Sequence, residues 1–98
     1  MAQFCVYRLS PTSLVLDLHT DLIETGTRVV APLVPLATGP RPFTRLEPIF
    51  DIGGTQYALH TAELAAIPAR FVNRPAVADL RAHEDDIRRA LDMVFSGF

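Results

Sequence analysis

The sequence predicts a mainly β domain (β+α), a small antiparallel sheet or barrel that is followed by one C-terminal helix. Three observations carry this prediction. Short runs rich in β-branched and aromatic residues fill the first two-thirds, a Gly53-Gly54 pair separates two such runs, and the final segment places apolar side chains at helical spacing. The 98 residues are enough for a single domain, 1–98, with one modest core.

The first two runs predict an N-terminal β-hairpin. Gln3–Leu9 is rich in strand-forming residues, and Ser10–Ser13 supplies a turn. Leucine then occupies alternate positions of Leu14–Thr20, which predicts that this strand has one buried face and one wet face. Asp17 and His19 fall on the face that is predicted to be wet.

A loop and a proline-bearing strand follow the hairpin. Asp21–Thr27 is predicted to be a loop in which Gly26 can take a positive φ. Arg28–Ala37 is apolar enough for a strand but contains Pro32 and Pro35. Because proline has no N–H to donate, this strand should lie at an edge, bend or be split.

A second hairpin is the clearest local signal in the chain. It follows a proline-rich connector, Thr38–Arg45. Strands Ile49–Ile52 and Thr55–His60 flank the two glycines, and a glycine pair suits the positive φ angles of a tight primed turn.

The stretch between this hairpin and the final helix carries weaker signals. Ala62–Pro68 predicts a helical turn that Thr61 caps and that stops before the proline. Ala69–Val72 predicts a short strand, and Asn73–Ala76 predicts a turn.

The final segment predicts an amphipathic helix. Acidic residues 84–86 fall in its early turns, where negative charge suits the helix dipole, and Asp85 and Arg89 have the spacing of an i, i+4 ion pair. Glycine is common just after a helix end, so the helix should stop near Ser96 or Gly97. Apolar side chains recur at helical spacing and form one stripe: Ile87, Ala90, Leu91, Val94 and Phe95.

The composition narrows the classes of function. A formal net charge of −2 and an isoelectric point near 5.8 argue weakly against direct nucleic-acid binding, which favours a basic face. The one cysteine, Cys5, cannot form an internal disulfide and is predicted to be a buried, inert thiol. The chain shows neither a signal peptide nor the ~18 apolar residues of a spanning helix, so we expect a cytoplasmic protein without a membrane partner.

No motif for catalysis or metal binding stands out. The three histidines lack ligand spacing, so no metal or other cofactor is predicted. No serine lies in a nucleophile motif, and no glycine loop suits a phosphate. Acid–base chemistry by Asp85-Asp86, or by Asp21 with Glu24, stays open, as does a ribonuclease that uses the scattered arginines. A solvated face and a loop explain these residues more simply, so we expect recognition at the apolar end of the final helix.

The chain contains, in order, five segments: QFCVY from Gln3, TDLIETGTRVVAPL from Thr20, PIFDIGGTQYALHTAELAAIP from Pro48, VADL from Val77 and HEDDIRRALDMVFSGF from His83. Their order and spacing resemble the CcdB family, the toxins of plasmid and chromosomal toxin–antitoxin modules. The resemblance spans Gln3 to Phe98. It implies an SH3-like barrel with a C-terminal helix, a homodimer, and a non-enzymatic poison that binds the A subunit of DNA gyrase and traps the cleaved DNA complex.

The resemblance also implies which residues bind gyrase. They belong to the end of the final helix, the start of the first strand and the loop after the second strand: Asp92, Ser96, Gly97, Phe98, Gln3, Phe4, Thr20, Leu22 and Glu24. Many family toxins have tryptophan where this chain has Ser96, and the family has asparagine at the position of Asp92. These differences leave an alternative, a protein of this fold with an altered target or lost toxicity that still binds an antitoxin.

Two further contacts follow from the resemblance. A CcdA-like antitoxin, whose C-terminal segment is disordered when free, neutralises the family's toxins. Its acidic peptide would meet basic side chains of the first hairpin and the connector, namely Arg8, Arg41 and Arg45. Met93 and Val94 are expected to approach the axis of the homodimer.

Overall fold

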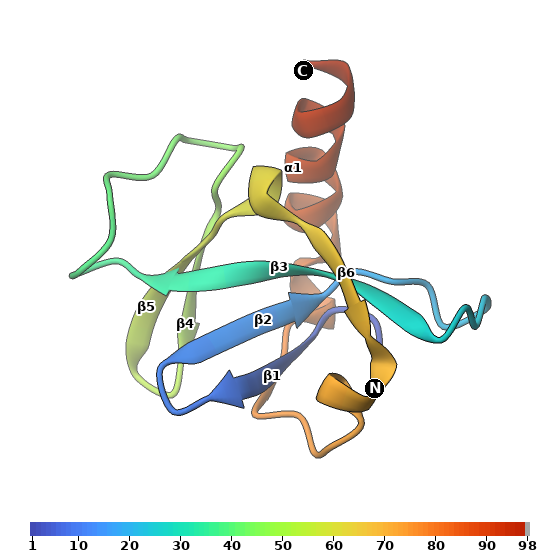
Figure 1. Cartoon of the computed structure of the whole chain (residues 1–98). Helices are drawn as coiled ribbons and strands as arrows, with labels where there is room; N and C mark the ends of the chain where they lie inside the picture. The colour runs from blue at the N-terminus through green and yellow to red at the C-terminus, as the bar shows by residue number, and fades with distance from the viewer. Residues whose placement is uncertain (98) are drawn as a thin grey trace.

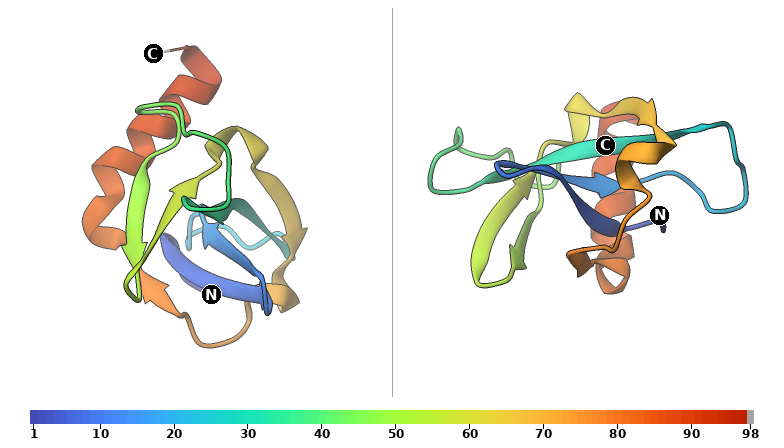
Figure 2. Two further views of the ribbon diagram at one scale, coloured as in Figure 1. Left: turned by 90° about the vertical axis from the view of Figure 1, so that its left-hand side faces the viewer. Right: turned by 60° about the horizontal axis from the view of Figure 1, so that its bottom comes forward.

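A computed structural model describes residues 1–97 of the chain, and Phe98, which the resemblance assigns to the gyrase contact, lies outside the described residues. Seven strands form one antiparallel sheet that curls into a nearly closed barrel, in the order β4-β5-β3-β2-β1-β7, with β6 paired to β3 (Figure 1). The strands are β1 (Cys5–Ser10), β2 (Ser13–Asp17), β3 (Thr27–Pro35), β4 (Ile49–Ile52), β5 (Thr55–Leu59), β6 (Ala65–Pro68) and β7 (Ala78–Asp79). Helix α1 (Glu84–Ser96) packs on the barrel (Figure 2). The predicted mainly β fold with one C-terminal helix is confirmed.

The N-terminal hairpin is confirmed, but its predicted wet face is wrong. β1 and β2 pair from Val6 opposite Leu16 to Ser10 opposite Ser13. Asp17 is fully buried, because the curled sheet covers both faces of β2. The leucines of β2 face one apolar cluster, and Val15 faces a second cluster that contains Cys5 and the side chains brought in by the chain after β5. Burial of the Cys5 thiol therefore agrees with the prediction.

β3 accommodates its prolines in the middle of the sheet. One of its edges pairs with β2, and the other pairs with β6 over Thr27–Val30 and with β5 over Leu33–Pro35. Pro32 lies where the neighbour changes, and its carbonyl accepts a 2.9 Å hydrogen bond from the His60 N–H. The strand is neither an edge strand nor split. The proline is tolerated because no ladder bond requires an N–H at the change of neighbours.

The local turn predictions at glycine are confirmed. Gly53 and Gly54 have φ angles of +61° and +87° between β4 and β5, as a primed turn requires. Gly26 has a φ of +79° in the loop before β3. Gly97 has a φ of +82° and ends α1, where its N–H donates to the Met93 carbonyl at 3.1 Å.

The stretch between β5 and α1 departs from prediction. A short 3₁₀ helix, η1 (Thr61–Glu63), replaces the longer helical turn, and Ala65–Pro68 forms β6 against β3. Thr61 is the first residue of η1, and its hydroxyl donates to the Leu46 carbonyl at 2.6 Å instead of capping. Ala69–Val72 is a second 3₁₀ helix, η2, because Val72 turns inward to the second apolar cluster. β7 was not predicted.

Helix α1 buries only part of its apolar stripe. It follows a short 3₁₀ helix, η3 (Arg81–His83). Ile87 and Ala90 are fully buried, but Phe95 is 72% exposed because the last turn of α1 extends past the barrel (Figures 1 and 2). The predicted pairing of Asp85 with Arg89 is wrong. The ion pairs join Arg88 to Glu84 at 2.7 Å and Arg89 to Asp86 at 3.5 Å.

Candidate interaction surface

The outer face of α1 carries two of the predicted gyrase contacts. Arg88, Asp92 and Ser96 are spaced four residues apart, so their side chains follow one another along one face of the helix. Asp92 and Ser96 are exposed. Gly97 ends the helix in a left-handed conformation.

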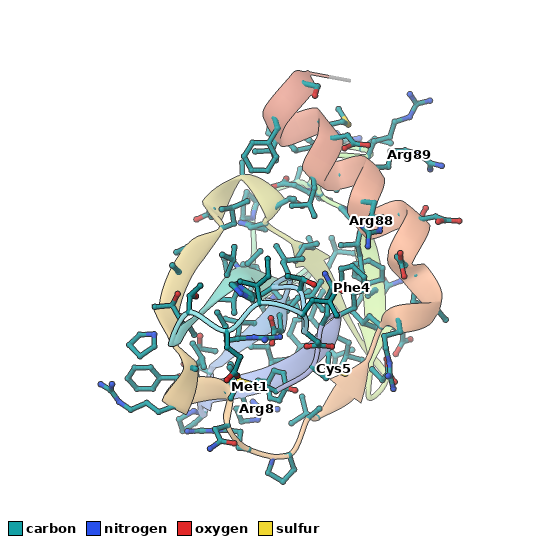
Figure 3. All side chains as sticks on the ribbon, turned by 90° about the vertical axis from the view of Figure 1, so that its right-hand side faces the viewer. Met1, Phe4, Cys5, Arg8, Arg88 and Arg89 are labelled. Atoms are coloured by element: carbon teal, nitrogen blue, oxygen red, sulfur yellow. The ribbon has the colours of Figure 1, made fainter. Side chains whose placement is uncertain are left out.

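The Phe4 side chain contacts this face of the helix at Arg88. The Arg88 guanidinium carbon lies 5.6 Å from the centroid of the Phe4 ring (Figure 3). The ring is only 3% exposed and belongs to the main core, so it positions Arg88 and offers almost no surface of its own. Phe4 has a φ of +66°, and both it and Gln3 lie in a turn before β1 rather than at its start. The backbone holds this turn on both sides, since Phe4 N–H donates to Asp17 and its carbonyl accepts from Leu80.

Gln3 joins the loop after β2 to the N-terminal turn. Its N–H donates to Asp21 Oδ1 at 3.1 Å, and its side-chain amide donates to the Leu18 carbonyl at 3.1 Å. In the same loop the Leu22 N–H donates to the Thr20 hydroxyl at 3.3 Å, and the Leu22 side chain is 92% exposed. Through Gln3, Phe4 and Arg88, the loop is therefore linked to the outer face of α1.

A buried ion network, which sequence reasoning missed, holds the base of this loop. Arg28 is 3% exposed, and its Nη2 lies 2.9 Å from both Asp17 Oδ2 and Asp21 Oδ1. The same nitrogen donates to the His19 carbonyl at 3.0 Å. Burial raises the pKa of the Asp17 carboxyl above its ordinary value, against the lowering effects of Arg28 and of the His19 N–H. The network ties β2, β3 and the loop together.

The predicted antitoxin contacts lie near the C-terminal end of β3, whereas the loop after β2 adjoins its N-terminal end. The connector after β3 and the loop before it project from opposite ends of this strand (Figures 1 and 2). A groove of about 390 Å³ brings the turn after β1 against the start of the connector, and Arg8, Pro11, Pro35, Thr38 and Tyr57 are among its lining residues. Arg8, Arg41 and Arg45 are exposed, and among residues 1–97 none of them forms an ion pair.

The connector is anchored by a buried histidine that sequence reasoning also missed. His60 Nδ1 is bonded to Glu63, and His60 Nε2 lies 4.0 Å from Glu47 Oε2. Glu47 in turn accepts the Phe43 N–H at 2.9 Å. His60 Nε2 is the one buried side-chain nitrogen or oxygen without a hydrogen-bond partner within the part of the chain that the structure describes. These contacts fix the base of the connector that carries Arg41 and Arg45.

A model of one protein family, described as CcdB protein, matches residues 3–97 of the 98-residue chain. The chain belongs to the CcdB family. This membership confirms the resemblance seen in the sequence, and it supports a toxin of the toxin–antitoxin type. No curated protein sequence matches the chain.

Two of the four carboxylates that sequence reasoning left open for acid–base chemistry have structural partners in this CcdB-family chain. Asp21 accepts from Arg28 and Gln3, and Asp86 pairs with Arg89. Within residues 1–97, no group of three or more His, Cys, Asp or Glu side chains is arranged to hold a metal ion. None of the helices among these residues is long and apolar enough to cross a membrane.

The apolar side chains near the end of α1 are only partly covered by the chain's own fold. Met93 and Val94, the residues expected at a dimer axis, are half-buried. Phe95, which sequence reasoning placed in the buried stripe, is the most exposed aromatic residue among residues 1–97. The CcdB-family helix therefore presents apolar surface as well as Asp92 and Ser96 at its end.

Proposed function

We propose that this CcdB-family protein is the toxin of a type II toxin–antitoxin module. It binds the A subunit of DNA gyrase and traps the cleaved DNA complex, without catalysing a reaction of its own. The observation that carries the proposal is the family match over residues 3–97. Its geometric support is the contact of Arg88, on the same face of α1 as Asp92 and Ser96, with the N-terminal turn, which in turn is bonded to the loop after β2.

The gyrase contact uses this surface. Asp92, Ser96 and Gly97 contribute from α1, and Phe98 follows them in the chain. The loop contributes Thr20, Leu22 and Glu24, with Leu22 as an exposed apolar tip. Gln3 contributes from the N-terminal turn, and Phe4 acts through Arg88 because its ring is buried. An apolar tip beside polar and charged groups is the usual composition of a protein–protein contact.

The other partners use different faces. A CcdA-like antitoxin places its acidic segment near Arg8, Arg41 and Arg45, which have no ion-pair partner among residues 1–97. A homodimer covers the half-buried Met93 and Val94. The protein acts in the cytoplasm, where gyrase works.

A second candidate function keeps the antitoxin but changes the target. Ser96 is exposed and offers only a hydroxyl at the position where many family toxins have tryptophan. Tryptophan is a frequent anchor at interface centres, and its truncation there costs about 2–4 kcal/mol of binding free energy. An altered target, or lost toxicity, follows if no neighbouring side chain replaces that anchor.

Expression in bacteria and calorimetry with a gyrase A fragment separate the two candidates. A gyrase poison arrests growth with double-strand breaks, and Asp92→Arg weakens binding to the fragment. Asp85→Arg is the matched control, because it makes the same charge change at an exposed position of the first helical turn. Growth without arrest, together with no heat of binding to the fragment, would contradict the gyrase proposal and favour the second candidate.

A further inference from the structure

A groove of about 540 Å³ lies beside the end of β1 and is separate from the surface assigned to gyrase. The segment Arg74–Val77 forms one wall, and the end of β1 together with Pro11 forms the other. Most of the lining side chains are apolar, among them Leu9, Pro11, Pro75 and Val77. Arg8 lies at this end of the molecule, away from α1 (Figure 3).

The groove exists because β7 is too short to cover the outer edge of β1. β7 pairs with Cys5 and Val6 only, and Val77 N–H donates to the Val6 carbonyl at 2.8 Å. In an antiparallel ladder, alternate residues turn their N–H and C=O groups to the same edge, so Arg8 faces the same side as Val6. There the Arg74 guanidinium donates to the Arg8 carbonyl at 3.0 Å, across 66 residues of sequence.

Two arginines thus flank an apolar groove. Arg8 Nη1 donates to the Pro11 carbonyl at 3.2 Å, so both guanidinium groups are held by main-chain oxygens. Neither arginine forms an ion pair among residues 1–97, in contrast to Arg28, Arg81, Arg88 and Arg89. Each guanidinium keeps further N–H donors for a carboxylate, which is the acceptor that fits its planar fork.

We propose that this groove binds an extended acidic peptide of a partner protein. One carboxylate lies between Arg8 and Arg74, and an apolar side chain packs against Pro75 and Val77. A peptide fits better than a nucleic acid, because the walls are mostly apolar and the chain carries a net charge of −2. The inference rests on the proposed antitoxin contact at Arg8 and adds a second wall, Arg74–Val77, to it.

Fluorescence anisotropy with a labelled decapeptide in which glutamate alternates with valine tests the inference. Arg74→Glu should weaken binding about tenfold or more, because a charge-assisted hydrogen bond is replaced by repulsion. Val77→Ser should also weaken binding while the charge is unchanged. Arg89→Glu is the matched control, with the same charge change on α1, and should leave the affinity within about twofold. Circular dichroism confirms that each variant is folded.

Three outcomes overturn the groove assignment: equal binding of the same peptide with glutamine for glutamate, an equal loss in Arg89→Glu, or no binding to the wild-type chain. The gyrase A fragment provides an independent readout on the same proteins. If the decapeptide binds and the fragment does not, the groove assignment stands and the gyrase proposal fails. If the fragment binds and the decapeptide does not, the groove assignment fails and the gyrase proposal stands.

Discussion

The guanidinium of Arg88 lies over the ring of Phe4, with 5.6 Å between the guanidinium carbon and the ring centroid. This contact joins α1 to the N-terminal turn, two segments that are more than eighty residues apart in the sequence. Arg88 is also paired with Glu84 one turn earlier on the helix. The N-terminal turn therefore holds both segments, α1 through the Phe4 ring and the loop after β2 through Gln3.

Removing the ring should destabilise the fold far more than removing the guanidinium. Phe4→Ala deletes a core side chain and should lower the free energy of unfolding by about 3–5 kcal/mol. Arg88→Ala removes only a cation–π contact and an exposed ion pair, and should cost about 1 kcal/mol or less. Urea denaturation of the two variants measures both values. A small loss for Phe4→Ala would show that the ring is a surface contact and does not support the core.

The Asp17–Arg28 pair should be required for stability. Arg28→Met leaves the carboxylate of the fully buried Asp17 without its cationic partner, and we expect a loss of about 3 kcal/mol in the free energy of unfolding. Arg81→Met, which removes an exposed pair with Asp79, is the control and should change stability little. If both variants unfold at the same urea concentration as the wild type, the buried network does not hold the loop.

Local signals in the sequence predicted the parts of the fold that depend on backbone conformation. Gly53-Gly54 and Gly97 each require a positive φ, and no distant residue is needed to predict the turn or the helix end at these positions. β6 could not be predicted in this way. Its alanine-rich sequence is compatible with helix, and it becomes a strand only because it pairs with Thr27–Val30, far back in the chain.

The residues of the candidate site likewise divide into those that local sequence predicts and those that depend on distant partners. Its helical members could be placed from the i, i+4 spacing of Asp92 and Ser96. The burial of Asp17 could not, because its partner Arg28 lies on the neighbouring strand and alternation alone assigns the aspartate to water. Phe95 follows the apolar period but is exposed, since a sequence period does not reveal that the helix is longer than the barrel beneath it.

The pKa values of two aspartates should be shifted in opposite directions from the ordinary value for this side chain. Hydrogen bonds from the Arg81 side chain lower the pKa of Asp79, so this group stabilises the fold above its ordinary pKa and loses that effect as the pH falls through the lowered value. Burial raises the pKa of Asp17, so protonation of this group favours the folded state as the pH falls through the raised value. Carboxyl carbon shifts in an NMR titration measure both groups.

The control for this titration is Arg81→Gln. It should return the pKa of Asp79 toward its ordinary value and leave the pKa of Asp17 unchanged, because the two carboxylates have different arginine partners. An Asp17 pKa below the ordinary range would mean that Arg28 outweighs burial in this site.

Tryptophan at position 96 should separate the two candidate functions. Ser96→Trp adds an aromatic side chain to the exposed end of α1, beside Asp92 and next to the exposed Phe95. If the surface is built for gyrase, the new ring supplies an interface anchor and should tighten binding to a gyrase A fragment about tenfold or more. Ala82→Trp, at an exposed position of η3 before the helix, controls for added apolar surface. Calorimetry measures both variants. Equal affinities for the two variants would mean that the end of α1 faces another target, because an anchor at the centre of a contact strengthens binding and the same ring elsewhere does not.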